Sequence, residues 1–88
     1  MATVGPPMED NEEKMRKKAM RIVTQVTELV TSIEAGGIDV SEARRSLDLA
    51  RSFLKANNPT KAIQYAKKAD GLARDKRERV KAENRNPS

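Results

Sequence analysis

The sequence contains no cysteine and no histidine, and its only aromatic residues are Phe53 and Tyr65. These absences exclude disulfide bonds, thiol chemistry, the usual zinc sites and any catalysis that depends on a histidine. A core with so few aromatic rings must be built from Leu, Ile, Val, Met and Ala. That composition favours closely packed helices over a sandwich of sheets.

Long apolar runs are also missing, because none reaches the roughly 20 residues that a helix needs to cross a bilayer. The first residues lack the basic start and apolar centre of a signal peptide, so we expect a cytoplasmic protein unless the chain is a domain of a longer one. The 88 residues are enough for one small domain.

The net charge of +5 is concentrated in the last third of the chain. Residues 59–88 carry nine basic and four acidic groups, whereas residues 1–58 carry nine of each. Such asymmetry is typical of proteins that bind nucleic acid, an anionic surface or an acidic partner. It is more often simply a solvated helix end that is rich in lysine and arginine.

Residues 9–35 are predicted to form the first helix, after a disordered lead at residues 1–8. Apolar residues recur at alternating spacings of four and three, the pattern of a heptad seam. The seam consists of Met15, Ala19, Ile22, Val26, Leu29 and Ile33. Val23 and Val30 widen it, as packing against two partners requires. Gly36 and Gly37 are expected to end the helix, because glycine adopts the left-handed conformation without a Cβ penalty.

Residues 40–56 are predicted to form the second helix. Asp39 followed by Glu42 fits the capping-box pattern at its start. One apolar stripe consists of Val40, Ala43, Leu47, Ala50 and Leu54. Leu49 and Phe53 form a second edge, so two faces of this helix are expected to pack.

Residues 59–82 are predicted to form the third helix, followed by a disordered tail at residues 83–88. Asn57 can take the left-handed conformation, Asn58 is a good N-cap and Pro59 suits the first helical position. So short a turn makes the second and third helices antiparallel neighbours. A stripe of four alanines, at 62, 66, 69 and 73, permits a close approach of two helices.

The fold class that follows is all-α, an antiparallel up-down-up three-helix bundle over residues 9–82. Within it, residues 43–76 resemble a single tetratricopeptide repeat, a 34-residue helix–turn–helix unit. Leu49, Ala50, Phe53, Ala62, Ala66 and Ala69 carry the resemblance at the spacings of that family. The sequence departs from the family pattern at Ser46, where a large residue is usual, and at Arg74, where proline is usual. Since repeat proteins need about three units to bury a core, we expect the first helix to cover the single hairpin.

The resemblance implies a ligand-binding face on the first helix of the hairpin, formed by Arg44, Leu47, Arg51, Leu54 and Lys55. Arg44, Arg51 and Lys55 would form a basic stripe that pairs with carboxylates of a partner. The alternative interpretation is that the preceding helix covers Leu47 and Leu54 and leaves the three charges as a solvated rim.

A second candidate surface is the basic side of the third helix. Its residues are Lys61, Lys67, Lys68, Arg74, Lys76, Arg77, Arg79 and Lys81. Phosphate contacts require such residues, because each neutralised phosphate releases counterions. Four acidic residues interrupt the run, and pairs such as Asp75 with Arg79 can form one turn apart. The scarcity of aromatic rings argues against the stacking of single-stranded bases.

No group of residues has the pattern of a catalytic centre, a metal site or a cofactor site. We therefore predict a non-enzymatic protein–protein interaction module with an unidentified protein partner. It would bind through the Arg44, Arg51 and Lys55 stripe or through apolar surface that the first helix leaves uncovered. A small basic nucleic-acid-binding protein is the alternative. We expect a monomer, or weak self-association through the heptad seam of the first helix.

Overall fold

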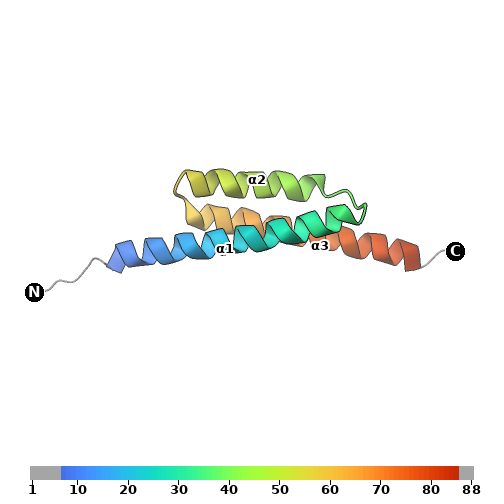
Figure 1. Cartoon of the computed structure of the whole chain (residues 1–88), viewed down its shortest axis with the longest axis horizontal. Helices are drawn as coiled ribbons and strands as arrows, with labels where there is room; N and C mark the ends of the chain where they lie inside the picture. Colours follow the sequence, from blue (N-terminus) through green and yellow to red (C-terminus); the bar gives the residue numbers. More distant parts are fainter. Residues whose placement is uncertain (1–6, 86–88) are drawn as a thin grey trace, which may run out of the picture.

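The computed structural model of the protein describes residues 7–85, with side chains for residues 12–83. Three helices and no strand occupy this part of the chain: α1 (Pro7–Ala35), α2 (Ser41–Lys55) and α3 (Pro59–Arg85). Figure 1 shows α1 and α3 running in the same direction, with α2 antiparallel to both. The predicted all-α, up-down-up three-helix bundle is therefore confirmed.

The ends of the helices differ from the prediction by a few residues. α1 begins at Pro7 rather than residue 9, because proline is tolerated in the first turn of a helix. α3 continues to Arg85 rather than residue 82, through a segment rich in Lys, Arg, Glu and Ala, which favour helix without tertiary contacts. The helices thus include residues 7–8 and 83–85, which lay outside the helices in the prediction. Residues 1–6 and 86–88 lie outside the described part.

α3 packs against both other helices, and the contact between α1 and α2 is the least extensive. The alanine stripe explains this central position. Ala62, Ala66, Ala69 and Ala73 are all fully or almost fully buried. Since alanine adds little bulk, the backbone of α3 can come close to its neighbours, as the sequence predicted.

The buried stripe of α1 is displaced by one position from the predicted seam. Val23 and Val30 lie at its centre, whereas Ile22 and Leu29 are only partly buried. Met15 is 38% exposed, because it lies level with the turn between α2 and α3, where the bundle ends. The remaining buried residues of this stripe are Ala19, Val26 and Ile33. The displacement places the two valines where they contact the common core of all three helices.

The apolar stripe of α2 is buried as predicted at Val40, Ala43, Leu47 and Ala50, while Leu54 is half-buried. The second predicted edge behaves differently. Phe53 is half-buried, and Leu49 is 46% exposed. The second packing face predicted for α2 is therefore covered only in part, at Phe53.

The turn between α2 and α3 has the predicted conformation. Asn57 has a left-handed φ of 63°, and its N–H bonds to the carbonyl of Leu54 at 3.0 Å. The N–H of Asn58 reaches the carbonyl of Phe53 at 2.8 Å, which completes a Schellman motif. The side-chain oxygen of Asn58 then accepts the N–H of Lys61 at 3.3 Å and caps α3.

The start of α2 differs from the predicted capping box. Val40 occupies the N-cap position, so Asp39 lies one residue before it and Glu42 is the second helical residue rather than the third. Asp39 instead accepts hydrogen bonds from the backbone N–H of Ser41 at 3.1 Å and from the hydroxyl of the same residue. This local turn replaces the expected reciprocal cap.

α1 and α3 are staggered along the long axis of the molecule. The first turns of α1 extend past one end of α2, and the last turns of α3 extend past the other (Figure 1). The principal dimensions are 72 × 19 × 16 Å, and the radius of gyration of 17.0 Å exceeds the roughly 12 Å of a compact domain of this length. The stagger thus turns a small bundle into a rod.

Candidate partner-binding surfaces

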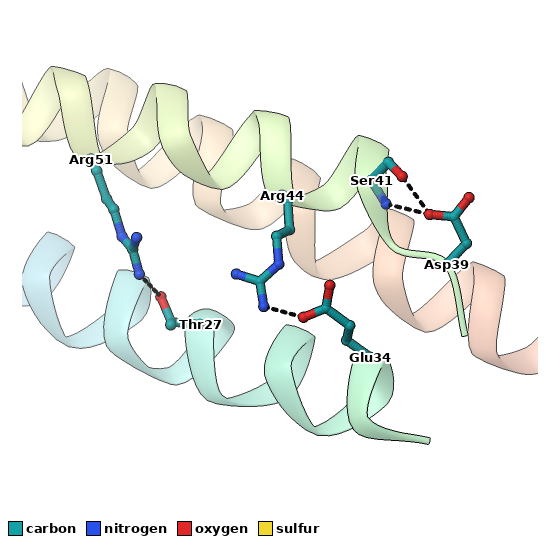
Figure 2. A network of polar contacts seen from close by, with 6 residues as sticks. All are labelled: Thr27, Glu34, Asp39, Ser41, Arg44 and Arg51. Atoms are coloured by element: carbon teal, nitrogen blue, oxygen red, sulfur yellow. Dashed lines mark hydrogen bonds and ion pairs between the residues drawn. The ribbon is translucent and has the colours of Figure 1, made fainter. Parts of the chain in front are cut away.

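The basic stripe predicted on α2 lies along the seam between α2 and α1. Arg44 forms an ion pair with Glu34 of α1, and Arg51 donates a hydrogen bond of 3.1 Å to the hydroxyl of Thr27 (Figure 2). Lys55 is exposed in the last turn of α2. Since both guanidinium groups turn toward α1, the stripe contributes to the packing of α1 against the hairpin.

The pairing across this seam changes the ionisation of both partners. The hydrogen bond from Arg44 lowers the pKa of the Glu34 carboxyl below its usual value and raises the pKa of the guanidinium. The hydrogen bonds from Ser41 likewise lower the pKa of Asp39. All of these carboxylates are solvent-exposed, so the shifts come from specific hydrogen bonds rather than from burial.

The cations of α3 do not lie on one side of the helix. They form two rows along α3, each at helical spacing. The row on the side toward α2 consists of Lys61, Lys68, Lys76 and Arg79. The row on the side toward α1 consists of Lys67, Arg74, Arg77 and Lys81. A hollow of about 230 Å³ confirms the second placement for Lys67 and Arg74, because Ile22 and Leu29 of α1 line it with them. The predicted continuous basic face is therefore corrected to two separate rows.

Several cations of α3 are already engaged. Arg74 pairs with Asp70 at 2.8 Å, and Arg79 pairs with Asp75 at 3.1 Å, the second of which the spacing predicted. The Nε of Arg77 is buried and has no hydrogen-bond partner within the described residues. These contacts reduce the number of cations that are available to phosphates.

The predicted alternative, an apolar surface that the first helix leaves uncovered, corresponds to a surface on the opposite side of the hairpin from α1. We call it the α2–α3 face, and it consists of Leu49, Phe53, Tyr65 and Leu72. Phe53 and Tyr65 stack with ring centroids 5.3 Å apart and planes inclined by 14°. The Nζ of Lys61 lies 5.5 Å from the centroid of Phe53, at the distance of a cation–π contact.

Simple helix geometry shows why α1 does not cover this face. Leu49 is two residues from Arg51, and Tyr65 is two residues from Lys67, so each pair lies on opposite sides of its helix. Arg51 and Lys67 are the members of these pairs that face α1. The second apolar edge in the sequence indicated Leu49 and Phe53, but only the three-dimensional arrangement reveals that they remain partly exposed.

The α2–α3 face continues into a hollow of about 250 Å³ at the start of α2. Leu72, Lys76 and Arg79 line it from α3, and Glu42 lines it from α2. A second hollow, of about 280 Å³, lies between α1 and the α2–α3 turn and is lined by Met15 and Pro59. Charged side chains therefore border the apolar surface at the first of these two sites.

The described residues include no cluster of three or more potential metal ligands. Within the same part of the chain, no helix is sufficiently long and apolar to span a membrane. We found no significant match to the chain among protein-family models, curated proteins or solved structures. The resemblance to a tetratricopeptide repeat thus stays a prediction.

Proposed function

We propose that the protein is a non-enzymatic interaction module that binds another protein through the α2–α3 face. The observation that supports this proposal is a stacked aromatic pair beside Leu49, a side chain that is 46% exposed, on a side of the hairpin that faces away from α1. Aromatic and large aliphatic side chains contribute most of the binding energy in protein interfaces. A cytoplasmic location is part of the same proposal.

Self-association through the heptad seam of α1 has less support. Three members of the seam, Ala19, Val26 and Ile33, are buried within the bundle, where a second copy cannot reach them without unfolding. The exposed part of the seam is limited to Met15 and the partly buried Ile22 and Leu29. The proposal therefore uses a heterologous protein partner and a monomeric module.

Site-specific photo-crosslinking tests the proposed surface. A photoreactive residue at Leu49 is expected to yield a discrete crosslinked partner in cells, which is lost when Leu72→Glu places a charge on the same face. The matched control is the same photoreactive residue at Glu78, which is exposed on α3. Equal products from both positions, or none from position 49, would contradict the proposal.

Nucleic-acid binding is the alternative, and the excess positive charge of residues 59–88 favours it. The division of the cations into two rows and their pairing with Asp70 and Asp75 weaken it. A titration with a short mixed-sequence duplex, followed through the amide signals, separates the two functions. Shifts over residues 61–81 that collapse as salt rises would support phosphate binding.

A further inference from the structure

The edge of α3 that borders the α2–α3 face alternates between cationic and apolar side chains. Lys61, Tyr65, Lys68, Leu72 and Lys76 follow one another at spacings of three or four residues. On a helix with 3.6 residues per turn, this spacing forms one continuous line along the surface. Tyr65 and Leu72 are partly buried, whereas all three lysines are exposed.

Among the described side chains, Lys61 and Lys68 have no acidic partner of their own, whereas Lys76 lies close enough to Asp39 to help lower the pKa of that carboxyl. None of the ion pairs in the described residues involves Lys61, Lys68 or Lys76. Lys61 extends its ammonium group over the ring of Phe53, so a positive charge lies directly beside the stacked aromatic pair. An anionic group of a partner would meet these charges without first displacing an existing ion pair.

Acidic side chains occur at only one end of the face. The hollow at the start of α2 is lined by Asp39, Glu42 and Asp75 together with Lys76. Asp75 is bound to Arg79 at 3.1 Å. At the other end of the face lie Lys61 and Lys68, and neither of them forms an ion pair with a carboxylate of the described residues. The face is therefore apolar along its middle and positive along its α3 edge.

We propose that the partner of the α2–α3 face is an acidic amphipathic helix with a heptad pattern, an inference that rests on the proposed function. Tyr65 and Leu72 are seven residues apart, and so are Lys61 and Lys68. A partner helix packed along α3 can meet Tyr65 and Leu72 with apolar residues that recur every seven residues. It can meet Lys61 and Lys68 with carboxylates that recur at the same interval. Such a helix lies along α3 on the α2–α3 face, on the side away from α1.

The two parts of this match have different roles. The apolar residues of the partner remove Leu49, Phe53, Tyr65 and Leu72 from water and supply most of the affinity. The carboxylates pair with the lysines at the edge, which sets the register and excludes basic helices. Binding should consequently weaken with salt without being abolished, because the apolar contacts are insensitive to screening.

Two synthetic helical peptides of about 20 residues, long enough to hold a stable helix when constrained, test the inference. Both carry leucine at the a and d heptad positions; one carries glutamate at e and g, and the other carries lysine. Each is titrated into isotope-labelled full-length protein while the amide signals are followed. The glutamate peptide is expected to shift the signals of Leu49, Tyr65 and Leu72 and to bind about tenfold more tightly or better than the lysine peptide.

Two variants of neighbouring lysines provide a matched control. Lys68→Glu reverses a charge at the edge of the α2–α3 face, and Lys67→Glu makes the same change on the side toward α1. Lys68→Glu should lower the affinity for the glutamate peptide about tenfold and raise the affinity for the lysine peptide. Lys67→Glu should change the affinity for either peptide about twofold at most. Both positions are exposed, and the amide spectrum of each variant reports whether the fold is retained.

Other results separate this inference from the proposed function. Equal binding of both peptides at the α2–α3 face would overturn the acidic partner while leaving the face as an interaction surface. Shifts confined to Arg44, Arg51 and Lys55 would overturn the assignment of the acidic helix to this face. Absence of shifts at the α2–α3 face with either peptide would overturn both the acidic helix and the proposed function.

Discussion

The guanidinium of Arg16 donates a hydrogen bond of 2.8 Å to the side-chain oxygen of Asn57. This contact joins α1 to the turn between α2 and α3 across 41 residues of sequence. Asn57 therefore has two separate roles, because its backbone adopts the left-handed conformation of the turn while its side chain fixes the position of α1.

Substitutions at Asn57 separate the two roles. Asn57→Gly keeps the left-handed backbone and removes only the hydrogen bond, which should lower the free energy of unfolding by about 0.5–1.5 kcal/mol at most. Asn57→Val adds the steric cost of a β-branched residue at φ 63° and should lower it by about 1–2 kcal/mol more. Urea denaturation measures both, with Arg16→Ala as a control for the hydrogen bond. Equal stabilities of the glycine and valine variants would show that the turn conformation is not required.

Two glycines should respond oppositely to alanine. Gly71 lies within α3, is exposed, and an added Cβ would meet no atom within 4 Å. Gly71→Ala should therefore raise the free energy of unfolding by about 0.5–1 kcal/mol, because alanine loses less conformational entropy in a helix. Gly37 has a φ of 89°, so Gly37→Ala should lower the same quantity by about 1 kcal/mol or more. Thermal denaturation should show shifts of opposite sign, and a loss of stability in Gly71→Ala would contradict the prediction.

The close packing of α3 should make its alanine stripe intolerant of larger side chains. Ala69 is fully buried, so Ala69→Leu should lower the free energy of unfolding by about 1–3 kcal/mol through overpacking. The same change at Ala82, which is exposed on α3, should stay within about 0.5 kcal/mol of the original protein. Denaturant titrations of both variants compare the positions directly. Tolerance of leucine at position 69 would mean that the helices are not held at close distance.

The ion pair between Glu34 and Arg44 should respond to pH in one direction. Because the pKa of Glu34 is lowered in the folded protein, the stabilisation is fully present above the unfolded-state pKa and is lost as pH falls through the folded-state value. Arg44→Gln should return the pKa of Glu34 upward toward its usual value. A carboxyl-detected NMR titration of both proteins provides the measurement. An unchanged pKa in the variant would exclude the hydrogen bond from Arg44 as the cause.

Local chemistry determined the parts of the fold that the sequence predicted best. The Asn57–Asn58–Pro59 turn follows from backbone preferences within three residues, and the alanine stripe follows from helical spacing alone. The centre of the α1 stripe could not be predicted in the same way. The predicted seam through Ile22 and Leu29 lies one residue from Val23 and Val30, and only the position of α1 against both other helices places the valines at the centre.

The candidate site depended still more on long-range contacts. Arg44 and Arg51 find their partners on α1 at separations of 10 and 24 residues, so a pattern within α2 could not reveal that these charges were engaged. The spacing of the α3 cations in the sequence is enough to divide them into two rows. The sequence does not show which of the two rows lies beside α2. Leu49 was predicted to pack because its spacing to Phe53 is regular, yet no element of the described chain covers it.

The stagger of α1 and α3 also determines how the module would present anything attached to it. In many domains the chain termini lie close together, whereas here Pro7 and Arg85 are at opposite poles of a molecule 72 Å long. A segment joined ahead of α1 and another joined after α3 would be kept apart by a rigid helical spacer. The α2–α3 face lies midway along that spacer, so a partner bound there would be positioned at a defined distance from both attached segments.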